Sequence, residues 1–446
     1  MDLTEGSILK KLLIFSLPLM ASNVLQLLFN AADIMVVGQF AGDNSLAAVG
    51  STSSVIHLLT NVFMGLSVGV NVLAARFFAA KQEEELSKTV HTAITISLFC
   101  GVLMVLIGEV AAEQILIWMD SPEEVIGLAT LYLRIYFLGM PATILYNFGA
   151  AILRAVGDTK RPLYYLSFSG LVNLILNCIF VIVFRMDVAG VALATILSQY
   201  LSAARIIICL GREEGAIHLT KTGLGVDGPI FRQIVQIGLP AGLQSSMFSI
   251  SNVVIQSSIN SFGPIAIAGN SAAQNLEGFL NVIVASFSQA GVAFVGQHVG
   301  AGKYERINKI VITLQVCVFT VGVVLGNLLY AFSGTLLYLY TTSSEVVAAG
   351  MVRMTYACRF YFFFGMMDSM VSVMRGLGKS VMPMVVALLG VCAFRIAWIA
   401  VLFSNELFRT IETIYVAYPV SWSLTFVAHT ICFLIIRRGF KKRWGV

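Results

Sequence analysis

The chain consists of long apolar runs that alternate with short polar turns. Twelve runs reach the length of about 20 mostly apolar residues that a helix needs to span a membrane. They are 12–38, 46–79, 88–118, 123–153, 162–184, 188–211, 230–261, 264–299, 304–334, 345–374, 381–403 and 410–436. The pattern predicts an all-α membrane protein with twelve transmembrane helices, several of them long enough to tilt in the bilayer.

The composition also indicates a membrane protein. Of the 446 residues, 58% are hydrophobic and 11% are charged, whereas soluble domains are about a quarter charged. The seven cysteines lie inside apolar runs and form no CxxC pair, so we expect neither a zinc site nor a disulfide framework. No small-residue cleavage site follows Lys10 and Lys11, so we expect the first helix to stay in the membrane.

The positive charges predict the orientation. If the N-terminus is cytoplasmic, most of the 28 lysines and arginines fall at cytoplasmic helix ends, while Arg185 and Arg409 fall at outer ends. Membrane proteins place their positive charge in this way. We therefore expect a multi-pass protein of the inner (plasma) membrane with both termini in the cytoplasm. The net charge of +5 then reflects topology and does not indicate a nucleic-acid partner.

The two halves of the sequence repeat each other at an offset of 221 or 222 residues. Anchors recur in the same order, including Leu17-Pro18 with Leu239-Pro240, and Arg154-x-x-Gly157 with Arg375-x-x-Gly378. Each half holds six predicted helices, so both halves enter the membrane from the same side. We expect two six-helix bundles related by a pseudo-two-fold axis along the membrane normal, with a substrate site near mid-membrane at their interface.

The polar stretch 212–229 marks the boundary between these halves. It contains glycines, charges and a terminal proline. We expect an N-terminal lobe at 1–211, a cytoplasmic linker at 212–229, and a C-terminal lobe at 230–446 that ends in a basic cytoplasmic tail.

An aspartate lies inside the first predicted helix. Asp33 precedes the first outer loop by ten residues, which places it roughly 15 Å below the outer surface. Asn173 and Asn177 share one face of the fifth predicted helix, and Thr195 lies at a similar depth on the sixth. Ionisable groups in membranes tend to be functional, and burial disfavours a charged carboxyl. We expect these four oxygen-bearing residues to bind a coupling proton or a hard cation, although the amides and hydroxyl can also simply link helices.

The C-terminal half carries different polar residues within its spans. At the positions that match Asp33, Asn173 and Asn177 it has Ile255, Phe394 and Trp398, so the oxygen cluster is not duplicated. Its own candidates for a substrate cavity are Gln256, Asn260, Asn275, Glu277 and Asp368. Internal ion pairs between these acids and Arg353, Arg359 and Arg395 are an equal alternative.

These features resemble the multidrug and toxic compound extrusion (MATE) transporters over essentially the whole chain. The resemblance rests on the repeated anchors, on Asn30-x-x-Asp33-x-x-x-Val37-Gly38, and on Val295-Gly296-Gln297 with Gly300-Ala301-Gly302-Lys303. It implies a two-lobe antiporter driven by H⁺ or Na⁺, with Asp33, Asn173, Asn177 and Thr195 in the coupling site. It also implies amphipathic, often cationic small-molecule substrates.

The chain departs from related chains at two positions, one of which bears on the coupling ion and the other on the branch of the family. Related chains often have a second aspartate where this one has Asn177, so the choice of ion stays open. The NorM-type branch uses a glutamate on the seventh helix, near the position of Phe248 here. The chain therefore resembles the DinF-like branch more closely.

Other functions fit the sequence less well. A lipid-linked saccharide flippase of the same superfamily would need more arginines in its central cavity. A major facilitator would need a GxxxDRxGRR-like loop, where this chain reads RFFAAKQEEELSK. A channel would not need the repeat, and no catalytic motif indicates an enzyme. We expect a monomer in contact with membrane lipid that uses no cofactor besides its coupling ion.

Overall fold

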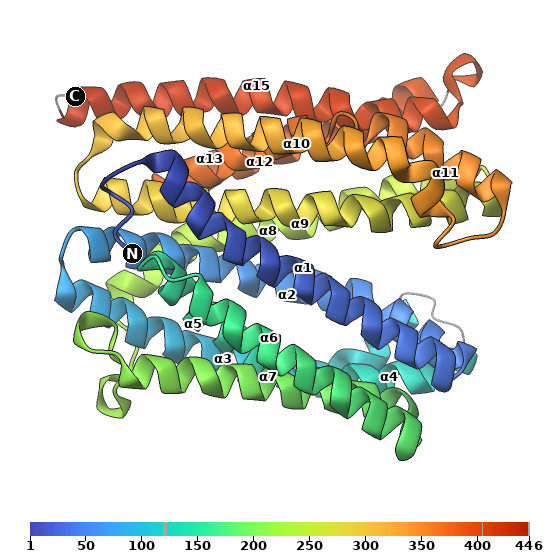
Figure 1. Cartoon of the computed structure of the whole chain (residues 1–446), viewed down its shortest axis with the longest axis horizontal. Helices are drawn as coiled ribbons and strands as arrows, with labels where there is room; N and C mark the ends of the chain where they lie inside the picture. Colours follow the sequence, from blue (N-terminus) through green and yellow to red (C-terminus); the bar gives the residue numbers. More distant parts are fainter. Residues whose placement is uncertain (119–122, 404, 445–446) are drawn as a thin grey trace. The chain divides into compact units, whose positions relative to one another are not determined.

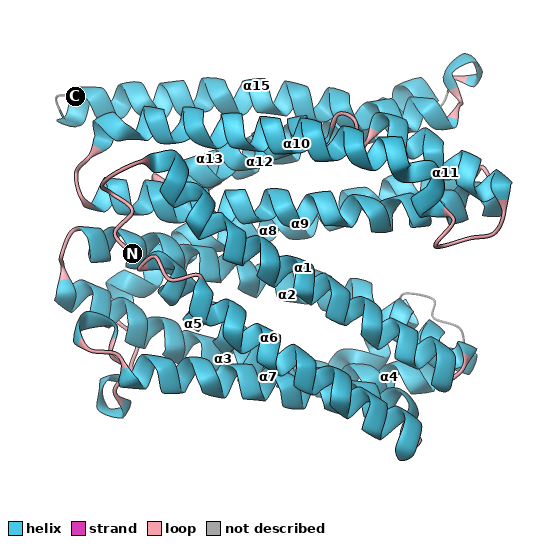
Figure 2. Cartoon of the chain, in the orientation of Figure 1, coloured by secondary structure: helices cyan, strands magenta, loops and turns pink. Residues whose placement is uncertain are grey.

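The computed structural model describes residues 1–118, 123–403 and 405–444. These residues form helices and short connections, and no strand occurs among them (Figure 2). The side chains of residues 43, 54 and 440–444 lie outside the description, and these include the lysines and arginine of the predicted basic tail beyond Arg438.

The chain folds into two compact units, whose helices are labelled in Figure 1. The first unit comprises Met1–Asp2 and Leu17–Gly242, and the second comprises Leu3–Ser16 and the chain from Leu243 onward. Two helices are divided between the units. Residues 3–16 pack with the second unit, and residues 228–242 pack with the first. These packing units do not test the predicted division into lobes at 1–211 and 230–446, which stays a prediction.

The helices of the first unit follow the predicted runs closely. They are the later part of α1 (Ile8–Phe40), α2 (Asp43–Ala79), α3 (Glu83–Trp118), α4 (Glu123–Leu138), α5 (Met140–Ala155), α6 (Lys160–Asn177), η1 (Cys178–Val183), α7 (Asp187–Arg212), η2 (Gly215–Ile217), η3 (Lys221–Gly223) and the start of α8 (Gly228–Asn260). The single predicted helix at 123–153 is divided, because α4 and α5 meet at an angle of 45°. Pro141 in the first turn of α5 explains this break, since proline fits a helix start but not a helix interior.

The second unit has a similar order of elements. They are the remainder of α8, α9 (Pro264–Gly300), η4 (Tyr304–Arg306), α10 (Ile307–Leu337), α11 (Ser344–Tyr356), α12 (Tyr361–Gly376), α13 (Val381–Ala387), η5 (Leu388–Ala393), α14 (Phe394–Trp398), η6 (Ile399–Phe403), η7 (Glu406–Phe408) and α15 (Ile411–Trp444). The predicted run at 345–374 is likewise two helices, α11 and α12. Five consecutive aromatic residues, 360–364, lie at the start of α12.

Nine helices among the described residues are long and apolar enough to cross a membrane, and the bent pair α4–α5 makes ten. They coincide with ten of the twelve predicted runs. The other two, 230–261 and 345–374, are helical as α8 and α11–α12 but are not among these ten. The chain is therefore an all-helical, multi-pass membrane protein.

Two small-residue motifs bring α2 and α8 into backbone contact within the first unit. A Cβ atom added to Gly65 would lie 2.2 Å from the backbone nitrogen of Gly242, and one added to Gly69 would lie 2.4 Å from the carbonyl oxygen of Ile234. Gly238 and Gly242 are equally close to α2. Gly-x-x-x-Gly on each helix allows such an approach in membranes, and it explains why the start of α8 packs with this unit.

The repeated R-x-x-G motif ends helices α5 and α12. Gly157 and Gly378 have φ values of +87° and +77°, and the next residue donates its backbone N–H to a carbonyl five residues earlier, at 2.9 Å in both cases. Glycine is the residue that adopts this left-handed cap without strain. The motif is therefore a helix stop. The Arg375 side chain does not extend this cap, but donates to Gln244 Oε1 at 3.0 Å.

The linker between α7 and α8 is docked on α3. His91 Nε2 accepts the backbone N–H of Thr220 at 3.1 Å. Thr95 and Thr92 accept the backbone N–H groups of Gly225 and Asp227 at 3.1 and 3.0 Å. These bonds fix the linker to the first unit.

Candidate functional site

The structure brings Asp33 of α1 against Asn177 at the end of α6. The Asn177 amide donates from Nδ2 to Asp33 Oδ1. Asn177 is fully buried and Asn173 is 5% exposed. Asp33 is partly buried, and a carboxylate that keeps a hydrogen bond avoids much of the cost of its burial, so this contact is the centre of the candidate site.

The other two predicted residues continue from this contact. Asn177 Nδ2 lies 3.5 Å from Asn173 Oδ1, and Asn173 Nδ2 lies 3.5 Å from Thr195 Oγ1. The Thr195 hydroxyl donates to the Val191 carbonyl at 2.9 Å. The four residues therefore form one polar cluster within the first unit. Asn177 Oδ1 is buried and has no hydrogen-bond partner among the described residues, so this cluster retains a free acceptor.

Local packing explains the position of the cluster. Gly170 lies one turn before Asn173 on α6, and a Cβ atom there would meet the Phe29 ring of α1 at 1.9 Å. Phe29 in turn lies one helical turn before Asp33. The missing side chain of Gly170 thus lets α6 approach the face of α1 that carries Asp33. Immediately after Asn177 the helix widens into the π-helical segment η1, a feature that often accompanies functional sites.

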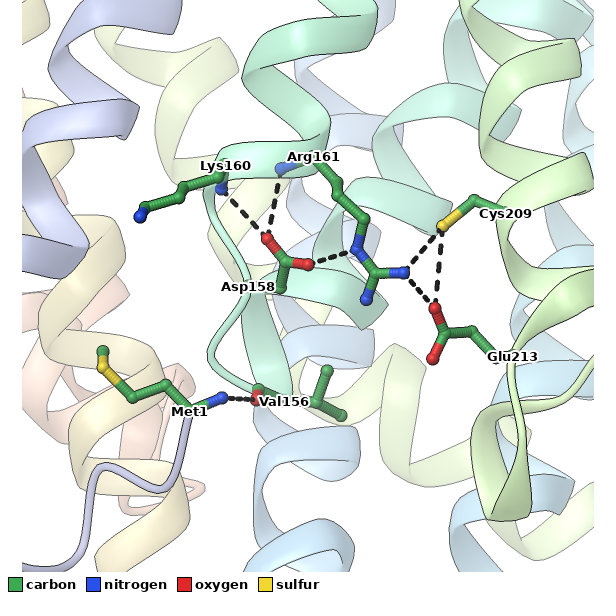
Figure 3. Close-up of polar contacts among 7 residues, drawn as sticks. All are labelled: Met1, Val156, Asp158, Lys160, Arg161, Cys209 and Glu213. Carbon is green, nitrogen blue, oxygen red and sulfur yellow. Dashed lines mark hydrogen bonds and ion pairs between the residues drawn. The ribbon is translucent and has the colours of Figure 1, made fainter.

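A second polar cluster anchors the start of α6, which is the end of this helix opposite Asn177 (Figure 3). Asp158 accepts the backbone N–H groups of Lys160 and Arg161 at 3.0 and 3.1 Å. The Arg161 guanidinium pairs with Asp158 and with Glu213 at the end of α7. The Met1 ammonium donates to the Val156 carbonyl at 2.9 Å. The contacts of Asp158 and Arg161 fix the beginning of the helix whose end carries the site, and that of Met1 holds the end of α5.

Two tyrosines near the cluster were missed in the sequence. Tyr132 and Tyr136 lie one turn apart on α4 with their rings stacked, 6.0 Å between centroids. Both phenols lie within electrostatic range of Asp33. Their spacing of four residues was the available signal, but the sequence does not show which helices α4 packs against.

Three of the predicted cavity residues in the second unit belong to one hydrogen-bonded chain. Gln256 donates to Asn260 at 2.9 Å and accepts from Asn270 at 2.8 Å. Asn270 Oδ1 accepts from Arg353 at 2.8 Å. Arg353 then pairs with Glu277 at 2.8 Å. The chain thus links Gln256, Asn260 and Glu277 through Asn270, which the sequence analysis did not single out.

The remaining two candidates are placed differently. Asp368 on α12 accepts the Ser288 hydroxyl at 2.5 Å. Asn275 lies exposed on α9. Neither is joined to the Glu277 chain by a hydrogen bond among the described residues. The same part of the chain contains no group of three or more His, Cys, Asp or Glu side chains that could hold a metal ion.

A family model identifies the chain. The MatE model matches residues 18–179 and again residues 240–401. The chain belongs to the MatE family. The second match begins and ends 222 residues after the first, which is the offset of the repeat in the sequence.

Relatives agree with the MATE assignment. The chain is 26% identical to the probable multidrug resistance protein YoeA of Bacillus subtilis over 429 residues, covering 95% of this chain and 92% of that protein. A MATE protein crystallised in complex with MaL6 has a TM-score of 0.92 at 21% identity, with 99% of both chains covered. A MOP superfamily transporter from Pyrococcus furiosus, whose binding pocket has a reversed polarity, has a TM-score of 0.93 at 20% identity, with 99% of this chain and 98% of that chain covered. These structures show that the fold is that of MATE transporters.

Proposed function

We propose that this MATE family member is a secondary active antiporter that exports amphipathic small molecules from the cytoplasm in exchange for protons. The efflux function is supported by the family and by the multidrug resistance protein that matches nearly the full chain. Coupling through the first unit is our inference from the contact between Asp33 and Asn177.

Asp33 is the residue on which the coupling rests. It is a carboxylate in a membrane-spanning helix, where an ionisable side chain needs a functional or structural reason. Its partner is a neutral amide, so the pair does not cancel the charge. A group that changes its charge during the cycle suits this environment better than a permanent ion.

The hydrogen bonds favour a proton over Na⁺ as the coupling ion. The amide nitrogens of Asn177 and Asn173 point at the oxygens of Asp33, Asn173 and Thr195. An N–H group repels a cation, so these oxygens are not available together as ligands. A Na⁺ ion needs several oxygens at once and would require both amides to turn, whereas a proton needs one acceptor and a turn of Asn177 alone.

Asn177 can serve Asp33 in both protonation states. The ionised carboxylate accepts the Asn177 N–H, as in the structure. When Asp33 takes up a proton, the new O–H needs an acceptor, and the unpartnered Asn177 Oδ1 supplies one after the amide turns. Amide oxygen and nitrogen are close in size, so the exchange needs little space. Proton uptake and release then occur without leaving Asp33 unpaired.

The topology completes the proposal. We propose that α8 and the α11–α12 pair are the two spans that bring the number to twelve, with both termini on the cytoplasmic side of the inner membrane. The two six-helix bundles would be related by a pseudo-two-fold axis along the membrane normal. We further propose a monomer of the DinF-like branch, because Phe248 stands near the position of the seventh-helix glutamate of the NorM-type branch.

A transport assay tests the coupling. Purified protein is reconstituted into vesicles loaded with ethidium or with flavin mononucleotide, and the external solution receives either a drop of about one pH unit or NaCl at constant pH. We expect the pH jump to accelerate efflux and Asp33→Asn to abolish the acceleration, because the amide cannot take up a proton. Asp187→Asn is the matched control, since Asp187 accepts a hydrogen bond from Ser45 in the same unit but lies outside the cluster.

Each alternative gives a different result. Efflux by Asp33→Asn at the wild-type rate under a pH jump would show that Asp33 is not the coupling residue. Acceleration by NaCl alone would identify Na⁺ as the ion. If neither gradient moves either dye, the flippase alternative gains support and is assayed with a lipid-linked saccharide.

A further inference from the structure

The second unit buries two arginines that share one aromatic ring. Arg353 comes from α11 and Arg395 from α14, and each is 3% exposed. The Tyr418 ring of α15 lies 5.1 Å from the Arg353 guanidinium and 4.1 Å from that of Arg395. Arginine stays protonated in proteins, so two permanent positive charges lie against the same buried tyrosine.

Arg353 has partners for its whole guanidinium. Its Nε and Nη2 atoms donate to Glu277 at 3.0 and 2.8 Å, and its Nη1 atom donates to Asn270 at 2.8 Å. The Glu277 side chain is 12% exposed and that of Arg353 is 4% exposed. This pair is therefore electrically balanced, and its hydrogen bonds are satisfied.

Among the described residues, Arg395 has neither a carboxylate that balances its charge nor a full set of hydrogen-bond acceptors. Its Nε atom donates to Ser421 at 2.9 Å, but its Nη2 atom is buried without a hydrogen-bond partner among the described residues. Within the same residues it makes no ion pair, whereas Arg353 does. Two guanidinium groups thus share one carboxylate, and the uncompensated charge coincides with the free N–H donors.

Such an arrangement is energetically unfavourable unless another group neutralises the charge and accepts the hydrogen bond. A charge in the membrane interior is costly, and a buried donor without an acceptor adds to that cost. The contacts with Tyr418 and with the Trp422 ring at 5.6 Å offset only part of it. An anionic group beside Nη2 would supply both the missing acceptor and the missing charge.

Aromatic rings stand next to this position. Trp422 packs against Tyr361 and Phe364 of α12, with 5.6 Å between ring centroids in both cases. A flat ligand can stack on aromatic side chains. The cluster therefore combines a cation that lacks an anion with rings that suit an aromatic body.

We propose that Arg395, with Tyr418 and Trp422, forms a subsite for the anionic group of an aromatic substrate, either a carboxylate or a phosphate monoester. The subsite lies within the second unit and rests on the proposed efflux function, whose substrate class it narrows. Glu277 keeps Arg353 neutralised, and so leaves Arg395 as the group that selects the anion. A purely cationic substrate would not complete the cluster.

Three flavins that differ in one substituent test the subsite. Riboflavin is neutral, flavin mononucleotide carries a phosphate, and 10-carboxymethylflavin carries a carboxylate. Binding to the purified full-length protein is followed by quenching of flavin fluorescence, without any gradient. Since hydrogen bonds to charged groups are stronger than neutral ones, we expect at least one anionic flavin to bind roughly tenfold or more tightly than riboflavin. Which of the two does so identifies the anion.

Two variants assign the preference to Arg395. Arg395→Gln should bind all three flavins alike, whereas Arg359→Gln should keep the wild-type preference. Arg359 is a suitable control because its guanidinium also lies over a tyrosine ring, that of Tyr330 at 5.1 Å, but the residue is exposed. If Arg395→Gln does not fold, Arg395→Lys takes its place. It keeps the charge but loses the planar fork, so the preference should fall several-fold.

The proposal is overturned if the wild-type protein binds riboflavin as tightly as both anionic flavins. It is also overturned if the preference survives unchanged in Arg395→Gln, or in Arg395→Lys when that variant is used. Because binding needs no gradient, a clear preference without gradient-driven efflux would contradict the proposed function and leave the subsite standing. Efflux without the preference would contradict the subsite alone.

Discussion

The contact between α2 and α8 makes a sharp prediction about Gly65. A Cβ atom at this position would lie 2.2 Å from the Gly242 nitrogen, 2.4 Å from its Cα atom and 2.6 Å from the Gly238 oxygen. All three are backbone atoms, so no side chain can rotate away. Carbon atoms pack best at about 3.5–4.0 Å, and Gly65→Ala therefore requires α8 to move away by roughly 1 Å or more.

We expect this displacement to destabilise the protein by about 1–3 kcal/mol, the usual cost of overpacking. The measurement is the fraction of detergent-solubilised protein that remains monodisperse on size exclusion after heating. Gly50→Ala on the same helix is the control, because a Cβ atom there meets nothing within 4 Å. Replacing an open helical glycine with alanine should stabilise by about 0.5–1 kcal/mol. The two alanine variants should thus shift the thermal midpoint in opposite directions.

An equal midpoint for Gly65→Ala and Gly50→Ala would refute the reasoning. It would mean that the start of α8 does not lie against α2 at the described distance. The packing of residues 228–242 with the first unit would then be wrong as well.

Two further predictions concern the polar clusters. Gly170→Ala should reduce pH-driven efflux about tenfold or more, because the added methyl forces α6 away from Phe29 and costs the hydrogen bond to Asp33. Adding Phe29→Ala should restore most of the efflux, and failure of this rescue in a stable double variant would contradict the packing argument. Glu277→Ala should lower the free energy of unfolding by about 3–5 kcal/mol, because it leaves Arg353 buried without its partner. Glu277→Ala combined with Arg353→Met should recover much of that loss in thermal unfolding, and an equal loss in both variants would show that the ion pair is not the cause.

The sequence determined much of the helical framework. Ten of the twelve predicted runs coincide with helices or a bent pair that can cross a membrane, because helix-length apolar runs have few other stable states in a protein of this composition. The repeat was equally visible, since the glycines and prolines that end helices act locally. Gly157 and Gly378 illustrate this, because each has the left-handed conformation that its cap requires.

The members of the coupling cluster were also visible in the sequence, although their role in coupling stays a prediction. Asp33 was marked by its charge within an apolar run. Asn173 and Asn177 were marked by their spacing on one helical face. Both signals lie within single helices, so they need no knowledge of how helices pack.

Only the tertiary structure decided which groups meet. It showed that the Asn177 amide N–H donates to Asp33, and that Asn270 joins Gln256 to Arg353. It also showed that the start of α1, up to Ser16, packs with one unit and the rest of the same helix with the other. The hydrophobic pattern predicts which faces of a helix are apolar. Which helices then pack together depends on the shapes of their surfaces and on single glycines such as Gly65 and Gly170. The Nη2 atom of Arg395, which has no hydrogen-bond partner among the described residues, could not be foreseen for the same reason, since a missing contact can be recognised only once its neighbours are in place.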